Sequence, residues 1–255
     1  RTVFLKRMES SVSALASSLD IYSRKLDLFE QGINEGKIVS MDDLDALESS
    51  LGDEDTEVDE KSLEEHILDD VDNKSYELET LKKDIQREKH LVSLVSAHLK
   101  ILNKDDSKIN CFAEQLKILQ KQNPNQKILV FSYFADTIKY LEGNIGKYCD
   151  FLIKAKTGFV SSKNKGDSKN MASRFSPKSK KYQFKDGESE LQYLFSTDVL
   201  SEGQNLQDSG ILINYDLHWN PVRMIQRNGR VNRLGSLFEE VRIYNMKPEQ
   251  KLDTY

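Results

Sequence analysis

The sequence is poor in several residue types, and each shortage excludes a class of protein. Its two cysteines, Cys111 and Cys149, lie far apart and lack the spacing of metal ligands. We therefore expect both to pack as ordinary side chains in a reducing compartment, the cytoplasm. No apolar run approaches the roughly 20 residues that cross a bilayer, so we expect no membrane partner. His90 and His98 have no accompanying Cys or carboxylate set, so we expect no metal site.

The start of the chain and one missing motif narrow the interpretation further. No signal peptide opens the sequence and Arg1 is not a natural start, so we interpret the chain as a fragment of a longer protein. It contains no Gly-x-x-x-x-Gly-Lys-Ser/Thr phosphate loop. The acidic cluster GDEDTE at 52–57 lies in a polar run and does not follow a strand pattern.

Charge is present in abundance but is unevenly distributed. The net charge is -5, yet residues 41–72 carry fifteen Asp or Glu against one Lys. Residues 151–185 carry ten Lys or Arg against one Asp. The distribution of charge, more than its sum, decides where a polyanion binds. The basic stretch is either a solvated loop or a phosphate-contacting surface that includes Lys163, Lys165 and Lys169.

Residues 1–104 read as a helical, coiled-coil-like projection. Apolar residues at three- and four-residue steps predict a helix over the first thirty residues, and a heptad seam predicts a second from about Leu63 to Leu102. The seam of this second helix is formed by Leu78, Leu81, Ile85, Val92, Val95, Leu99 and Leu102. We expect the two helices to pair, with an acidic mobile loop at about 41–60 between them.

Residues 105–255 alternate between helix and strand patterns. Short apolar runs predict strands at 127–132, 149–153, 191–196, 210–216 and 240–246. Amphipathic helices are expected after a cap at Asp106 or Ser107, and from about Ala135 to Gly143 or Gly146. This alternation predicts an α/β layer structure with a mainly parallel sheet. In such sheets ligands bind beyond the carboxyl ends of the strands.

Four arginines gather in the segment DLHWNPVRMIQRNGRVNRLG, residues 216–235. Asn220 can cap a helix that begins at Pro221 and ends near Gly229, with Val222 and Ile225 facing the sheet. Only one acid, Asp216, is near in sequence, so the arginines lack an anion, and guanidinium matches phosphate bidentately. Pairing with distant acids inside the fold is the alternative.

These segments carry a resemblance to a known family. Residues 216–235 resemble motif six of superfamily two helicases, Gln-x-x-Gly-Arg-x-x-Arg, and with DLHWNP and LG are similar to the Swi/Snf-like branch of DNA translocases. STDVLSEGQNLQ (196–207) resembles motif five, and KILVFSYFADTIKYL (127–141) resembles motif four. DDSKINCFAEQLKIL (105–119) resembles the helix that opens the second RecA-like domain. FLKRMESSVSALASSLDIY (4–22) is similar to the helical connector of bacterial and phage-type members.

The resemblance implies a RecA-like three-layer α/β/α fold and the role of a second motor lobe in a DNA-dependent ATPase. Partners would be duplex DNA and the N-terminal RecA-like lobe of the same protein, which would hold most of ATP and its Mg²⁺. The fragment alone would then be inactive. The oligomeric state stays unknown. A degenerate lobe that serves only as a binding scaffold is the alternative.

The resemblance also assigns roles to individual residues. Arg230 and Arg233 would be arginine fingers, which stabilise charge on the transferring phosphoryl group. Gln226 and Arg227 would orient them or contact the nucleotide, and Gly203 and Asn205 would lie near it. Ser196 and Thr197 would touch a nucleic-acid phosphate, and Thr157 and Gly158 would form a second phosphate-contacting turn.

The sequence departs from the Swi/Snf-like pattern in two motifs. Val231, Asn232 and Ser236 replace the usual Ala-His and Gln of motif six. Leu200 and Ser201 replace two glycines of motif five. The fingers are retained, but the subfamily is left open: remodelling of protein–DNA complexes, a restriction-type defence motor, or action on RNA polymerase.

Overall fold

The chain forms two compact units, which are described separately. The computed structural model describes residues 2–34, 37–38, 69–70, 77–102, 106–152, 156–162, 165–200, 205–233, 236 and 238–247. One unit comprises Arg1–Met8 and Val12–Asp105, and the other comprises Glu9–Ser11 and Asp106–Tyr255. The short segment Glu9–Ser11 therefore belongs with the second unit although it lies near the start of the chain.

The first unit is a pair of long helices with a short additional helix. These are α1 (Thr2–Ser10), α2 (Val12–Asn34) and α5 (Leu78–Leu102). The predicted seam is confirmed at Ile85, Val92 and Leu99, which are buried and cluster with Leu15, Leu19, Leu26 and Ile33 of α2. It is wrong at Val95 and Leu102, which are 44% and 51% exposed. One partner helix covers a narrow stripe of α5, so every seventh residue is buried but the neighbouring heptad position is not.

Two other expectations for this unit need correction. The first helix is interrupted at Ser11, between α1 and α2, and α5 begins at Leu78 and not near Leu63. Residues 69–70 form a short strand, β2 (Asp69–Asp70), that pairs antiparallel with β1 (Lys37–Ile38). The acidic loop predicted at about 41–60 lies outside the described residues.

The second unit is built on a five-stranded parallel sheet, as predicted. The strands lie in the order β4-β5-β3-β6-β7, and every pair is parallel. The strands are β3 (Ile128–Phe131), β4 (Thr157–Val160), β5 (Tyr193–Ser196), β6 (Ile211–Asn214) and β7 (Arg242–Asn245). The central strands β3, β5 and β6 are buried along their whole length, which explains their continuous apolar runs.

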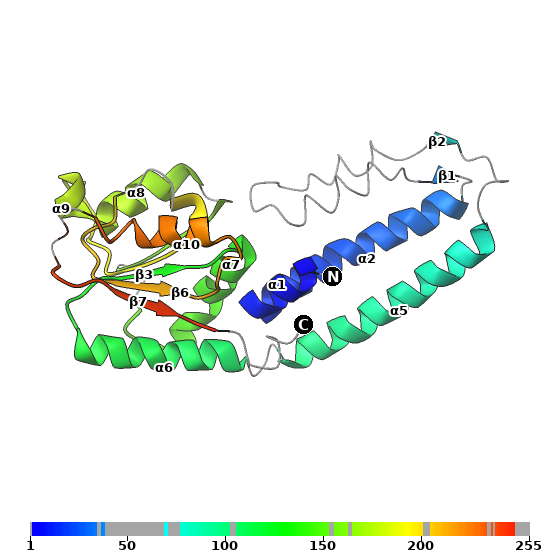
Figure 1. Cartoon of the computed structure of the whole chain (residues 1–255), viewed down its shortest axis with the longest axis horizontal. Helices are drawn as coiled ribbons and strands as arrows, with labels where there is room; N and C mark the ends of the chain where they lie inside the picture. The colour runs from blue at the N-terminus through cyan, green and yellow to red at the C-terminus, as the bar shows by residue number, and fades with distance from the viewer. Residues whose placement is uncertain are drawn as a thin grey trace. The chain divides into compact units, whose positions relative to one another are not determined.

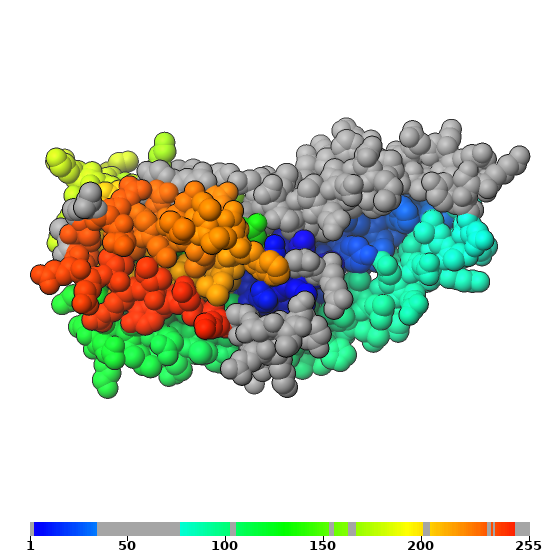
Figure 2. Space-filling model, viewed as in Figure 1, coloured from blue at the N-terminus to red at the C-terminus, as the bar shows by residue number. Residues whose placement is uncertain are grey.

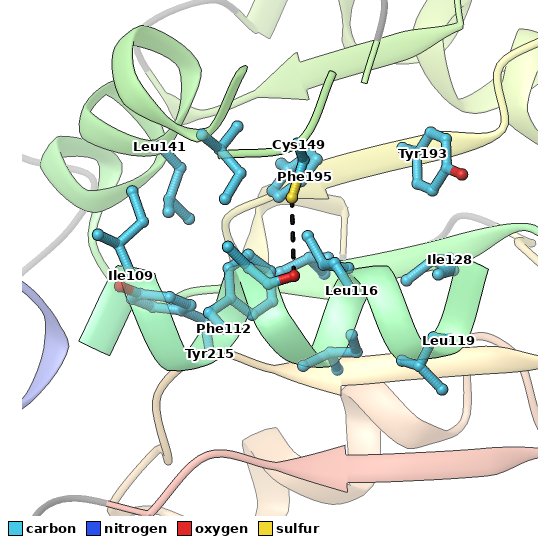
Figure 3. Close-up of a cluster of buried hydrophobic side chains, with 14 of the residues drawn as sticks. Ile109, Phe112, Leu116, Leu119, Ile128, Leu141, Cys149, Tyr193, Phe195 and Tyr215 are labelled. Carbon is cyan, nitrogen blue, oxygen red and sulfur yellow. Dashed lines mark hydrogen bonds between the residues drawn. The ribbon is translucent and has the colours of Figure 1, made fainter. Parts of the chain in front are cut away.

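Helices cover both faces of this sheet and complete three layers (Figure 1). One face packs against α6 (Ser107–Gln122) and α7 (Ala135–Asn144) through a cluster that includes Phe112, Leu116, Phe195 and Tyr215 (Figure 3). In this cluster the Cys149 thiol lies 3.7 Å from the Ala113 carbonyl oxygen. The other face packs against α8 (Lys165–Phe175) through Ala172 and Phe175. The predicted RecA-like α/β/α layering is confirmed.

Local signals placed most of these elements correctly. Asp106 is the N-cap of α6, where its side chain accepts hydrogen bonds from the Lys108 and Ile109 amides. The strand expected at 149–153 is wrong over the described part, because residues 149–152 form turns and pack on the core beside Cys149. The strand of this region is β4, which begins at Thr157. The remaining short helices are η1 (Ile145–Lys147), α9 (Pro177–Lys180), η3 (Asp198–Leu200) and α10 (Pro221–Asn228).

Candidate nucleotide and nucleic-acid site

The carboxyl ends of four strands meet at one edge of the sheet. Phe131, Val160, Ser196 and Asn214 are register partners and end β3, β4, β5 and β6. The polar residues that follow these ends are Ser132, Thr197, Asp198 and Asp216, all of them buried. Buried polar groups are retained where partners satisfy them, so this edge is the chemically specialised part of the unit.

Helix α10 begins beyond this edge and carries two of the four arginines, Arg223 and Arg227. Asn220 is its N-cap and accepts a hydrogen bond from the Val222 amide, and Pro221 occupies the first turn, as predicted. The expectation that Val222 and Ile225 face the sheet is wrong, because they are 53% and 69% exposed. Figure 2 shows α10, in orange, at the surface of this unit. The helix turns Arg227 toward the sheet instead.

Arg227 is the most buried charged side chain of the site. Its Nε and Nη2 atoms donate to the two carboxylate oxygens of Asp198 at 2.5 and 2.8 Å, and Nη1 donates to the Asp216 carbonyl oxygen at 3.1 Å. The guanidinium carbon lies 5.6 Å from the ring centroid of Phe131. A bidentate ion pair of this kind fixes the arginine geometrically. For Arg227 the alternative interpretation, pairing with a distant acid, is therefore the correct one.

Asp216 is satisfied from several directions. Its Oδ2 accepts hydrogen bonds from the Ser132 and Ser10 hydroxyls, each at 2.5 Å, and its Oδ1 accepts one from the Tyr133 amide at 2.7 Å. The Tyr133 ring lies edge-on to His218 with centroids 4.5 Å apart, and burial lowers the pKa of His218. The lowered pKa favours the neutral imidazole, and the Nδ1 atom of His218 accepts a hydrogen bond from the Asn220 amide.

Arg230 and Arg233 follow α10 but differ in exposure. Arg230 is 8% exposed; its amide donates to the Arg227 carbonyl, and its carbonyl accepts a hydrogen bond from the Leu206 amide at 3.1 Å. Arg233 is exposed, and its Nε donates to the Gly229 carbonyl at 2.8 Å. In the described part of the chain Arg233 has no ion-pair partner, so its charge is available to an external anion.

The motif-five residues lie around the same arginines. Asn205 precedes Leu206, the residue bonded to Arg230, and its side chain hydrogen-bonds the amide and side chain of Gln207. Gln226 is half-buried, and no described residue bonds its buried Oε1 atom. The structure thus brings Gln226, Arg227, Arg230 and the Asn205 turn together. Gly203 lies outside the described residues.

Ser196 and Thr197 lie at the carboxyl edge, but their side chains face inward. Both are fully buried, and Ser196 Oγ donates to the Thr197 carbonyl at 2.7 Å. Thr197 Oγ1 has no partner among the described residues. A buried hydroxyl without a partner costs free energy, so this turn is better suited to a state in which an added group satisfies it.

Thr157 and Gly158 are not brought to this edge. They begin β4 in place of the predicted turn, and Thr157 is the register partner of Tyr193 at the start of β5. Thr157 lies three residues and Gly158 two residues before Val160, which is about 10 Å and about 7 Å of strand from the carboxyl edge. A Cβ at Gly158 would lie 2.8 Å from Leu191 Cδ1 and 3.1 Å from Met171 Sδ, so close packing explains this glycine.

The basic stretch is more ordered than a loop. It contains α8 and α9, and Lys169 is exposed on α8, whereas Lys163 lies outside the described residues. Lys165 begins α8. Asp208 holds the start of α9 by accepting hydrogen bonds from the Lys178 and Ser179 amides. The positive charges are thus carried, in part, by helices anchored to the sheet unit.

Sequence reasoning missed the two residues that organise the site from outside the motif-six helix. Asp198 belongs to the motif-five segment and receives no role of its own from the resemblance, although an acid two residues after a buried strand is a usable signal. Ser10 gave no signal, because its contact with Asp216 spans most of the chain. Among the described residues no cluster of three or more His, Cys, Asp or Glu could hold a metal ion, and no helix is long and apolar enough to cross a membrane.

Comparison with known proteins identifies the family. Residues 107–235, about half of the chain, match the helicase conserved C-terminal domain. The chain belongs to this family. The match contains strands β3 to β6 and helix α10, so the carboxyl edge described above lies within the matched domain.

Three similar proteins illustrate the range of the resemblance. Over 65 residues the chain is 45% identical to the uncharacterized ATP-dependent helicase YqhH of Bacillus subtilis (strain 168), a match that spans 26% of this chain and 12% of that protein. The C-terminal part of the Fun30 ATPase domain is 20% identical, with a TM-score of 0.45 over 71% of this chain and 58% of that one. The Pyrococcus furiosus Hef helicase domain is 20% identical, with a TM-score of 0.41 over 71% and 34%.

Proposed function

We propose that the chain is the second motor lobe of an ATP-dependent translocase that moves on duplex DNA. The observation that carries this proposal is the different surroundings of two arginines. Arg227 forms an ion pair with Asp198 inside the fold, whereas Arg233 is exposed and has no ion-pair partner in the described residues. Membership of the helicase family and the YqhH match support the use of ATP by the full-length protein.

Arg230 and Arg233 act as arginine fingers in this proposal. Arg227 is a positioning residue, because its ion pair holds α10 against the carboxyl edge and sets the turn from which both fingers extend. The buried Gln226 Oε1, which no described residue bonds, suits a contact with the nucleotide. A charged donor already in place stabilises developing phosphoryl charge without reorganisation.

Nucleic acid is contacted by the basic stretch. Lys163, Lys165 and Lys169 neutralise backbone phosphates, an interaction that is independent of sequence and sensitive to salt. Ser196 and Thr197 contribute only if the turn after β5 opens, since both hydroxyls are buried here. The positions of Thr157 and Gly158 in β4 do not favour the phosphate contact first assigned to them.

Mg²⁺ does not fit the described residues of this chain. They offer no acidic cluster, and the two acids of the site, Asp198 and Asp216, are engaged by Arg227 and by hydroxyl and amide donors. The proposal therefore assigns Mg²⁺ and most of the triphosphate to an N-terminal RecA-like lobe of the full-length protein. Two cysteines without disulfide spacing favour the cytoplasm.

A separation-of-function experiment in the full-length protein tests the proposal. Arg230→Ala and Arg233→Ala should each lower the kcat of ATP hydrolysis by about 10³-fold or more, with duplex DNA affinity within about twofold. Lys163→Ala, Lys165→Ala and Lys169→Ala combined should weaken DNA binding and reduce its salt slope by roughly one unit per lost contact. Basal ATP turnover should survive the lysine changes.

Matched controls keep the outcomes distinct. Arg87→Ala removes an exposed arginine of α5, and Lys83→Ala, Lys100→Ala and Lys121→Ala together remove three exposed lysines elsewhere. If the arginine variants weaken DNA binding as much as the lysine variants do, the arginines belong to a nucleic-acid surface. If no variant changes turnover, the lobe is a scaffold. The 255-residue chain alone should hydrolyse no ATP above background.

A further inference from the structure

The segment Glu9–Ser11 is held inside the second unit by a dense set of hydrogen bonds. Ser10 and Ser11 are buried, with 0% and 2% of their surface exposed. The Ser10 hydroxyl donates to Asp216 Oδ2 at 2.5 Å and lies 2.7 Å from the Thr137 hydroxyl. Ser11 Oγ lies 2.8 Å from the same threonine hydroxyl. Two adjacent serines therefore bind side chains from α7 and from the end of β6.

A buried lysine holds the backbone of the same segment. Lys108 Nζ, from the first turn of α6, donates to the Ser10 carbonyl at 3.0 Å and to the Glu9 carbonyl. The ammonium group also lies 4.3 Å from the Tyr215 ring centroid. A cation on the last carbonyls of α1 is a favourable C-terminal interaction. Side-chain and backbone contacts thus fix Ser10 on both sides.

Asp216 connects this segment to the arginines through a short path. The Asp216 carboxylate accepts a hydrogen bond from the Ser10 hydroxyl, and the Asp216 backbone carbonyl accepts one from Arg227 Nη1. The Arg227 carbonyl in turn accepts the Arg230 amide at 3.0 Å. The side chains of this path, which are Ser10, Asp216, Arg227 and Arg230, are all buried. Water therefore screens their interactions only weakly.

We propose that Ser10 is a positioning residue for Arg230, acting through Asp216 and Arg227. This inference rests on the proposed function, since it presupposes that Arg230 stabilises the transferring phosphoryl group. Within the part of the chain that the structure describes, the Ser10 hydroxyl bonds neither Gln226 nor Arg230, the residues assigned to nucleotide contact. Its influence is transmitted by the orientation of the Asp216 carboxylate and carbonyl.

The test measures ATP hydrolysis by the full-length protein with and without duplex DNA. Ser10→Ala should lower the DNA-stimulated kcat about tenfold, equivalent to about 1.4 kcal/mol of barrier, with the KM for ATP and the DNA affinity within about twofold. Ser10→Thr, which keeps the hydroxyl, should restore most of the rate. Asp216→Asn combined with Ser10→Ala should cost little more than Asp216→Asn alone, because both act on one path.

Ser18→Ala is the matched control, since Ser18 is equally buried but its hydroxyl donates only to the Ala14 carbonyl of its own helix. If Ser10→Ala behaves like Ser18→Ala, or raises KM and leaves kcat unchanged, the proposal is wrong. Should Ser10→Ala fold poorly, hydrogen exchange of residues 221–233 in Ser10→Thr and Asp216→Asn decides: unchanged protection in both overturns it. Loss of turnover in Arg230→Ala with none in Ser10→Ala refutes only the positioning role; full turnover in Arg230→Ala refutes the proposed function.

Discussion

The two units differ in what they bury. In the described part of the helical unit the buried polar side chains are Ser18 and Lys25, which lie on α2 beside the apolar seam. In the sheet unit several of them lie at the carboxyl edge and are joined by hydrogen bonds: Ser132, Asp198, Asp216 and Arg227. Both units are stabilised by apolar burial, but only the second arranges buried charge into a connected set.

This contrast separates structural from functional polarity. Burial removes hydration from the Lys25 ammonium group, and this desolvation lowers the pKa of Lys25 to about 8. Arg227 is more deeply buried, yet a bidentate carboxylate and a carbonyl replace its hydration. Connected buried charge is costly to assemble and holds side chains in defined orientations, which the proposed function requires of the arginines.

The largest effect is expected from breaking the buried ion pair. Arg227→Met should lower the free energy of unfolding by about 3–5 kcal/mol, because the buried Asp198 carboxylate loses its bidentate ion pair with Arg227. Adding Asp198→Asn should recover part of this loss. Urea denaturation of the 255-residue chain measures both, with Arg87→Met as a surface control. A loss for Arg227→Met no greater than that for Arg87→Met would contradict the role of the pair.

A smaller contrast is expected between two buried leucines. Leu194→Ala in β5 and Leu26→Ala in α2 remove the same atoms, and each should cost about 2–5 kcal/mol. Leu194 is fully buried within a layered core, whereas Leu26 lies in a two-helix seam that can partly collapse onto the gap. The sheet variant should therefore cost more in thermal or urea unfolding. Equal losses would show that the helical seam is packed as rigidly as the sheet.

The smallest effect concerns the pH dependence of the helical unit. The pKa of Lys25 is 10.5 in its ordinary environment and about 8 in the folded chain. Between these values the unfolded chain binds the proton and the folded chain does not, so stability contributed by this group rises with pH across the window. Lys25→Met should flatten the rise and stabilise the chain near pH 7. Denaturation at pH 7, 8, 9 and 10 measures it; an unchanged slope would contradict the desolvation argument.

Local patterns predicted most elements to within about two residues. The apolar runs at 127–132 and 210–216 became β3 and β6, and Asp106 and Asn220 became helix caps. These features depend on residues close in sequence. The prediction of a strand at 149–153 was wrong. The strand in this region, β4, is defined by its pairing with β5, and the more apolar residues 149–152 form turns that pack against the core.

The sequence by itself determined where the strands and caps of the sheet unit begin, which segment carries the four arginines, and that no phosphate loop accompanies them. Only the tertiary structure decided which arginine is neutralised, why Gly158 has no side chain, and where Ser10 lies. The physical reason is range: capping and periodicity act over a few residues, whereas the pairs Arg227–Asp198 and Ser10–Asp216 join residues 29 and 206 positions apart. Such contacts leave no periodic trace in the sequence.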